Sequence, residues 1–408
     1  MHLSVSFLYE TDKYAVLCKN KWIMQYSFLF SAAVAVSLAA VFSGCERLEL
    51  NPKAQAPEPA FVSLEDVAQL LASIPLEAGH LEEVHDAAVA SAGNGYDEEY
   101  RMQDLFAAPG TGVGASASTK AGTYRHPLRD ALREAFLSTK AGGGADAAWL
   151  DSLALSDVQI YWPYSDKWDG VTAPVITYDP GDGATQNEGF ALLSDGTLKK
   201  LMVEESMTRD RPVWVINRNS DADYKSLELR RREDPNWGNG GGDILLKSGG
   251  KDFKTLILRS FKAYRQYDSW FAGASEFFVK MGAVEDFRAS TEAELRLYDP
   301  AITDFMIVVR RGQLEKEIPF NAILVSEWTS QLSSCGFMMI EDDGGTRTSW
   351  KCSAMVKVES KSYGFELELP LCSRDDIVWR GSLTRNFIER NSGSPVRFGD
   401  VELVMELI

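Results

Sequence analysis

A chain of 408 residues is long enough for two or three domains. Its formal net charge of −17 gives a surface that repels phosphate backbones and anionic lipid head groups, so we expect no nucleic-acid partner. The chain holds only four histidines, which disfavours catalytic or metal sites that need several imidazoles.

The first 44 residues have the pattern of a bacterial lipoprotein signal. An apolar stretch from Phe28 to Phe42 follows three lysines and is shorter than the roughly 20 apolar residues of a spanning helix. Small residues, Ser43 and Gly44, stand directly before Cys45. We expect residues 1–44 to be a signal peptide and Cys45 to carry a lipid. The alternative is an ordinary secretory signal in which this cysteine has no role.

This reading places the mature protein in the cell envelope, tethered to a membrane outside the cytoplasm, either periplasmic or surface-exposed. Removal of residues 1–44 leaves a net charge of about −18, so the acidic surface itself should not bind the membrane. We expect the lipid to be the only membrane contact, since several acyl chains hold a protein durably.

Residues 45–60 are polar and contain three prolines, which predicts a tether. Residues 61–140 carry helical spacing of apolar side chains, and Ser63 is the expected N-cap of the first helix. Further helices are expected over 77–90, 96–106 and 126–137. Residues 139–147 are rich in glycine and predict a connector.

From residue 148 onward, short β-branched and aromatic runs alternate with turn residues, which favours β-sandwich architecture. We expect a first β domain over 148–245 and a C-terminal β-sandwich over 252–408. The predicted fold is therefore mainly β with an α-helical N-terminal segment. The expected strands cover 158–162, 175–178, 213–216, 255–261, 277–281, 305–310, 322–327, 337–341, 349–358, 363–369 and 401–407.

Four aromatic residues are candidates for ligand binding. Trp162, Tyr164 and Trp168 lie close together in a segment that a proline interrupts, and Trp237 lies in a glycine-rich loop. Exposed aromatic rings on loops can stack on sugars or on partner side chains. The alternative for the first three is core packing, because a sandwich core also needs large aromatic side chains.

Two acidic turns supply candidate calcium ligands. Asp342 and Asp343 precede a glycine pair, and Asp375 and Asp376 precede a hydrophobic strand. Calcium takes six to eight oxygen ligands, but neither turn follows the ligand order of an EF-hand loop. Solvated turns are the alternative. We expect no other cofactor.

Histidine and cysteine give no catalytic pattern, so we expect no catalytic residue. His80 and His85 are five residues apart, which turns them about 140° from each other on a helix, and we expect both to be solvated. Of Cys335, Cys352 and Cys372, the first two could form a disulfide, or all three could be buried thiols.

Four segments together resemble predicted lipoproteins of the Bacteroides group: Gly95–Tyr100, Ile160–Ser165, Arg211–Asn217 and Asp375–Gly381. This resemblance covers most of the mature chain and implies outer-membrane placement, but that family carries no assigned activity. The step from Asp375 to Val378 also resembles the loop-to-strand step of C2-like sandwiches, which implies a C2-like C-terminal domain.

These expectations favour a non-catalytic envelope module that binds a glycan, a peptide or a protein. The alternative is a hydrolase that uses two carboxylates on a carbohydrate, since 59 acidic residues allow many pairs.

The lipid anchor gives a direct prediction. Cys45→Ala should move the protein from the membrane pellet to the soluble fraction, because the acidic mature surface offers no other attachment. Fractionation after detergent-free lysis measures this. A variant that still pellets with the outer membrane would show that another contact holds it there.

Overall fold

The computed structural model describes residues 62–107, 128–139, 145–181, 183–219, 224–233 and 253–408. Residues 57–408 form one compact unit. The expected signal peptide, Cys45, the tether over 45–60 and Trp237 lie outside the described residues.

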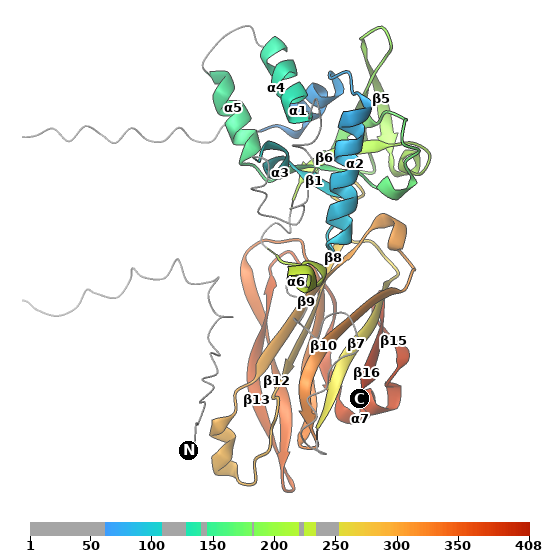
Figure 1. Ribbon diagram of the computed structural model, residues 1–408. Coiled ribbons are helices and arrows are strands. Elements are labelled where there is room, and N and C mark those ends of the chain that lie inside the picture. The colour runs from blue at the N-terminus through green and yellow to red at the C-terminus, as the bar shows by residue number, and fades with distance from the viewer. Residues whose placement is uncertain (1–61, 108–127, 140–144, 182, 220–223, 234–252) are drawn as a thin grey trace, which may run out of the picture. The chain divides into compact units, whose positions relative to one another are not determined.

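Seven α-helices are found in the described part of the chain (Figure 1). The first confirms its predicted start, because the Ser63 hydroxyl accepts a hydrogen bond from the Asp66 amide at 3.4 Å. Their bounds are α1 Leu64–Ala72, α2 Ala78–Gly93, α3 Met102–Phe106, α4 Leu128–Thr139, α5 Ala145–Ala154, α6 Leu227–Glu233 and α7 Arg385–Asn391.

The expected helix over 96–106 is wrong in its first half. Glu99–Arg101 forms strand β1, which pairs with a strand from residues 158–161, and only Met102–Phe106 is helical. The hydrogen bonds of the sheet therefore outweigh the helical spacing of the apolar residues. Helix α5 likewise begins inside the expected connector over 139–147.

The first sheet has six strands in the order β1-β2-β6-β3-β4-β5, of which only β3 and β6 run parallel. Helix α1 packs on β3, β4 and β6, and Leu71 of this helix shares one hydrophobic core with Trp214 of the sheet. The expected segments 61–140 and 148–245 thus bury their apolar faces against each other. The remaining bounds are β2 Val158–Tyr161, β3 Val175–Tyr178, β4 Gln186–Leu192, β5 Leu198–Glu204 and β6 Val213–Arg218.

Residues 253–408 fold into two antiparallel sheets. One has the order β10-β7-β16-β15 and the other β13-β12-β11-β8-β9, with β14 also pairing with β11. The bounds are β7 Phe253–Ala263, β8 Ser275–Ala283, β9 Ala301–Val309, β10 Ile318–Thr329, β11 Leu332–Glu341, β12 Arg347–Val358, β13 Lys361–Cys372, β14 Asp376–Thr384, β15 Ser394–Phe398 and β16 Val401–Leu407.

The core of this part lies between the two sheets. Phe261 and Leu403 from one sheet and Phe277 and Phe337 from the other are fully buried in a single cluster. The predicted fold class, mainly β with helices in the N-terminal region, is confirmed. The likeness to C2 domains stays a prediction.

Two glycines face each other at the centre of the larger sheet. Gly282 on β8 pairs with Gly336 on β11. A Cβ atom at Gly282 would lie 2.2 Å from Leu367, and one at Gly336 would lie 2.5 Å from the Cys352 sulfur. The β12–β13 hairpin therefore packs directly on bare backbone at this point.

The three C-terminal cysteines are free thiols. Cys335 is fully buried in the core, whereas Cys352 and Cys372 are half-buried. The possible disulfide between Cys335 and Cys352 is therefore not formed in the structure. The alternative of three free thiols holds, although only Cys335 is fully buried.

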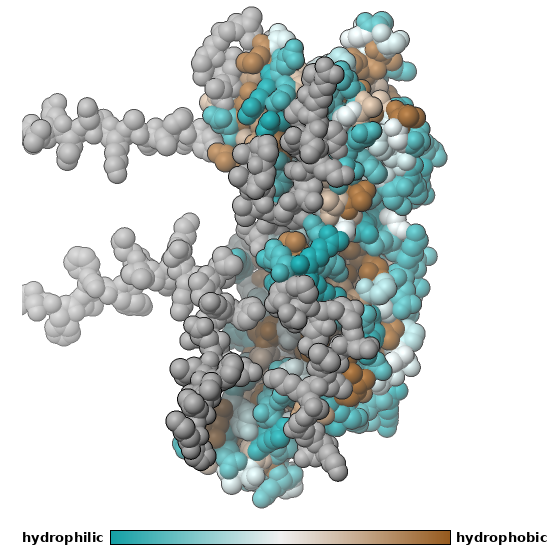
Figure 2. All heavy atoms as spheres, in the orientation of Figure 1, coloured by the Kyte–Doolittle hydropathy of each residue, from teal (hydrophilic) through white to brown (hydrophobic). Residues whose placement is uncertain are grey.

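Exposed apolar side chains are scattered over separate elements. Leu155, Val171 and Leu297 are each more than 70% exposed, and they lie far apart in the sequence. On the face drawn in Figure 2, hydrophobic colour occurs in separate spots, and a hydrophilic patch covers the position of the arginine-rich helix α6. Within the described residues, none of the helices has both the length and the apolar character needed to cross a bilayer.

The shared core of α1 and the first sheet predicts the effect of a cavity. Leu71→Ala should lower the free energy of unfolding by about 2–5 kcal/mol, because Leu71 is fully buried and its methyl groups would leave a void. Urea denaturation measures this. Met202→Ala, at a position that is 56% exposed on the same sheet, is the control and should change stability by less than about 0.5 kcal/mol. Equal effects of the two changes would contradict this account of the core.

Candidate functional site

A pocket of about 100 Å³ lies where strand β2 ends and strand β6 begins. Because β2 and β6 are antiparallel, with Tyr161 opposite Val215, the segment after β2 meets the segment before β6 at one edge of the sheet. The pocket is lined by Trp162, Tyr164, Lys167, Trp168, Asp169, Thr172, Thr208, Arg209, Asp210, Arg211 and Pro212.

The structure brings three of the four predicted aromatic residues to this pocket. Trp162 is almost fully buried and packs edge-on against Trp214 at 5.7 Å, so it serves the core as much as the pocket. Trp168 is half-buried, and its indole N–H donates to the Thr172 carbonyl oxygen at 3.0 Å. Tyr164 is only 8% exposed. Trp168 therefore offers the most accessible ring of the three.

His85 of helix α2 is a contact of the site that the sequence did not predict. Its ring lies 5.1 Å from the Trp168 ring and 5.6 Å from the Trp162 ring, and its Nε2 is 3.2 Å from the Ser165 carbonyl oxygen. The expectation that both histidines are solvated is wrong. His80 is 4% exposed, and its Nδ1 accepts a hydrogen bond from the Glu77 amide.

The buried carboxylate of Glu98 fixes the loop below the pocket. Tyr164 has a left-handed backbone, with φ 60° and ψ 36°, which costs a residue other than glycine about 1–2 kcal/mol. The Glu98 carboxylate accepts hydrogen bonds from the Tyr164 amide at 3.1 Å and from the Ser165 amide and hydroxyl, both at 2.9 Å. These three bonds hold the strained turn in place.

Burial makes this carboxylate easy to protonate. Loss of water contact and then the charge of Asp97 raise the pKa of Glu98, while the Ser165 and Tyr164 hydrogen bonds and the charge of Arg310 lower it. The net result is a pKa of about 7. Near neutral pH, Glu98 therefore changes charge within the folded protein.

Cationic side chains surround the pocket. The exposed Arg209 makes a side-chain hydrogen bond to the Tyr164 hydroxyl, which raises the pKa of Arg209. The Lys167 ammonium lies 4.2 Å from the centre of the Tyr164 ring. Arg211 is half-buried, and its buried Nε has no hydrogen-bond acceptor among the described residues. This N–H would favour an acceptor supplied by a ligand.

The Asp169 carboxylate and the Ser165 hydroxyl beside the pocket are already engaged. The Asp169 carboxylate accepts from the Val171 amide and from the Thr172 amide and hydroxyl, and the Thr172 hydroxyl leads the contacts that lower the pKa of Asp169 to about 2. The Ser165 hydroxyl is buried and donates to Glu98, while His85 contacts the carbonyl of Ser165. This geometry activates no serine, because the imidazole does not reach the hydroxyl.

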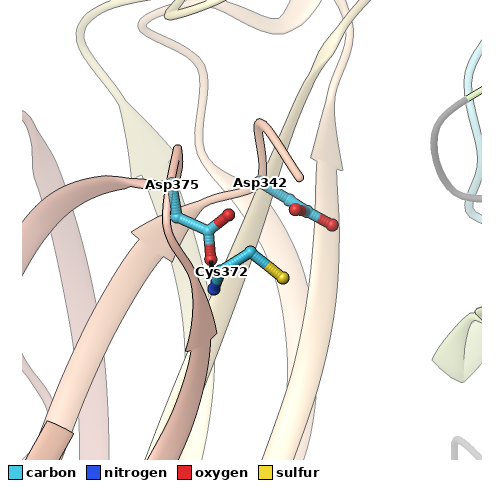
Figure 3. A group of neighbouring side chains, drawn as sticks. All are labelled: Asp342, Cys372 and Asp375. Atoms are coloured by element: carbon cyan, nitrogen blue, oxygen red, sulfur yellow. Dashed lines mark hydrogen bonds between the residues drawn. The ribbon is translucent and has the colours of Figure 1, made fainter. Parts of the chain in front are cut away.

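The structure also brings together two of the four predicted calcium ligands. Asp342 and Asp375, from neighbouring loops, form a group with Cys372, and the ligand atoms of the three residues lie within 4.8 Å of one another (Figure 3). Asp342 accepts from the Gly344 amide at 2.9 Å and Asp375 from the Cys372 amide at 2.6 Å. Hydrogen bonds from nearby backbone amides to an aspartate carboxylate are typical of turns, so these contacts fit the alternative of solvated acidic turns.

The other two predicted ligands are exposed. Asp343 and Asp376 lie near each other. Burial is the main cause that raises the pKa of Asp343, and the charge of Asp376 raises it further. Burial, with the Asp375 and Asp342 charges, also raises the pKa of the Cys372 thiol, which disfavours the thiolate that a metal would need.

No family model, no curated protein and no solved structure matches this chain. The resemblance to lipoproteins of the Bacteroides group stays a prediction.

The buried carboxylate predicts how stability depends on pH. The folded-state pKa of Glu98, about 7, lies above its ordinary value of 4.5, so its contribution to stability is present at low pH and is lost as the pH rises toward 7. In the wild type, Glu98 should lower the free energy of unfolding by up to about 3 kcal/mol as the pH rises from about 5 to 7.5. Glu98→Gln should remove this part of the fall. Urea melts across this range measure the slope.

Glu82→Gln, which changes an exposed glutamate of helix α2, is the control. It should keep the wild-type slope. Equal slopes in wild type and Glu98→Gln would mean that Glu98 keeps its charge in the folded protein throughout this range.

Proposed function

We propose that this chain is a non-catalytic binding module of the bacterial cell envelope, anchored by a lipid on Cys45. Its ligand is a glycan that carries a carboxylate, and the pocket at Trp168 is the binding site. The observation that carries this proposal is a half-buried indole beside Arg211, whose buried Nε has no acceptor in the described part of the chain.

The size of the pocket supports contact with one group of a larger ligand. A pocket that buries a small-molecule ligand has a volume of about 300–1,000 Å³, whereas this pocket has about 100 Å³. A sugar ring lying on Trp168 would therefore remain largely outside while its carboxylate entered the pocket. There, Arg211 could donate to it, and Arg209 and Lys167 add positive charge at the rim.

The runner-up function, hydrolysis of a carbohydrate by two carboxylates, finds less support at this site. A general acid must keep its proton near neutral pH, whereas the three donors on Asp169 hold its pKa at about 2. The protonatable carboxyl, Glu98, is buried beneath the loop with three hydrogen bonds of its own. A sugar in the pocket would not reach it.

A glycan array with matched acidic and neutral oligosaccharides tests the proposal on the purified protein. Binding should favour the acidic members, and both Trp168→Ala and Arg211→Met should weaken it by about tenfold or more, as expected for a lost charge-assisted hydrogen bond or stacking contact. Titration by isothermal calorimetry gives the affinities.

Val171→Ala is the matched control, because Val171 lies in the same loop, is 77% exposed and does not line the pocket. It should bind like the wild type. Equal binding by all three variants, or selection of peptides over every glycan, would contradict the proposal.

A further inference from the structure

A second group of carboxylates lies deeper in the sandwich than the two acidic turns. It consists of Asp268 from the loop between β7 and β8, Glu276 from β8, and Glu341, the last residue of β11. One ligand oxygen from each residue lies within 4.8 Å of the other two. Glu276 is 8% exposed and Glu341 has no exposed surface. Three acids thus converge where water has little access.

The side chains beside the Glu341 carboxylate are those of Asp268 and Ser275. Neither Glu341 oxygen meets the geometry of a hydrogen bond with a described residue, and the same holds for Oδ2 of Asp268. No described lysine or arginine forms an ion pair with either residue. A buried carboxylate without an ion-pair partner is costly, so the presence of Glu341 calls for a bound cation or proton.

The loop that carries Asp268 is held from both sides. The Arg311 guanidinium donates to the backbone carbonyls of Asp268 at 2.7 Å and of Gly273 at 3.0 and 3.1 Å. The Ser275 hydroxyl oxygen accepts the amides of Tyr267 and Asp268 at 2.8 and 3.3 Å. All these contacts use backbone groups or the serine, so they position the loop and leave the Asp268 carboxylate for a ligand.

We infer that Asp268, Glu276 and Glu341 form a calcium site that ties the β7–β8 loop to strands β8 and β11. Carboxylate oxygens are the donors that hard divalent cations prefer, and Ca²⁺ accepts them at about 2.3–2.6 Å in flexible geometry. Oxygens up to 4.8 Å apart fit on opposite sides of such an ion. The smaller Mg²⁺ needs near-ideal octahedral ligands and is usually held by only one or two carboxylates, so three converging carboxylates suit it less well.

Proton binding is the competing state of the same residues. Burial raises the pKa of both Glu341 and Asp268. The hydrogen bond between them raises the pKa of Glu341 and lowers that of Asp268, and the charge of Asp343 raises both. Arg311 lowers the pKa of Asp268, and Asp97 raises it. Protonation of these carboxylates competes with Ca²⁺ for the same oxygens.

The site can be tested with chelator-treated, full-length protein and Ca²⁺ alone. Isothermal calorimetry should show one saturable site, and Ca²⁺ should raise the melting temperature. Glu341→Gln and Asp268→Asn should each weaken Ca²⁺ binding by at least about tenfold. The isosteric amides keep the packing, and melting without Ca²⁺ verifies that both variants are folded.

The double variant Asp342→Asn/Asp375→Asn is the control, since it removes the neighbouring acidic pair and leaves the three buried residues intact. It should bind Ca²⁺ like the wild type. The inference is overturned if wild type binds no Ca²⁺, if it prefers Mg²⁺, if Glu341→Gln binds normally, or if the control alone loses binding. None of these outcomes depends on the glycan site, which lies on the first sheet.

Discussion

The structure depends on two adjacent buried carboxylates, Asp97 and Glu98, which precede strand β1. Glu98 accepts three hydrogen bonds from the Tyr164–Ser165 turn, and Asp97 accepts the Ala274 amide at 2.8 Å from the loop before β8. Gly273 has a φ of +136°, and a Cβ atom there would lie 2.9 Å from Asp97. The pair thus orders the pocket loop and the loop of the proposed calcium site, at the cost of burying two acids.

Local patterns were enough to predict most strands but not those with polar faces. The β-branched runs over 175–178 and 401–407 coincide with β3 and β16, because their sequence preference and their burial agree. Strands β4 and β5 were missed, since their exposed face is polar and their sequences alternate weakly. Tyr96 and Tyr100 have the four-residue spacing of a helix, yet Tyr100 belongs to a strand because β2 lies beside it.

The candidate sites were predicted only where their residues are close in sequence. The aromatic run from Trp162 to Trp168 could be recognised directly, as could Asp342 and Asp375 as acidic turns. His85 and Arg211 reach the pocket through the packing of α2 and the pairing of β2 with β6, and one sequence does not reveal either. Asp268 and Glu341 meet for the same reason. Burial, which gives the acids their chemistry, is set by contacts distant in sequence.

The facing glycines, Gly282 and Gly336, limit how this sequence can diverge. Strand positions usually drift among valine, isoleucine and threonine, which improve local β preference. Here any Cβ atom would meet the Leu367 or Cys352 side chain well inside contact distance, so a gain in strand preference would force that side chain of the β12–β13 hairpin out of its packed position. In related sequences, these two positions should stay glycine together or change only alongside a smaller residue at 367 or 352. Such paired substitution would report the hairpin's docking without any measurement on the protein.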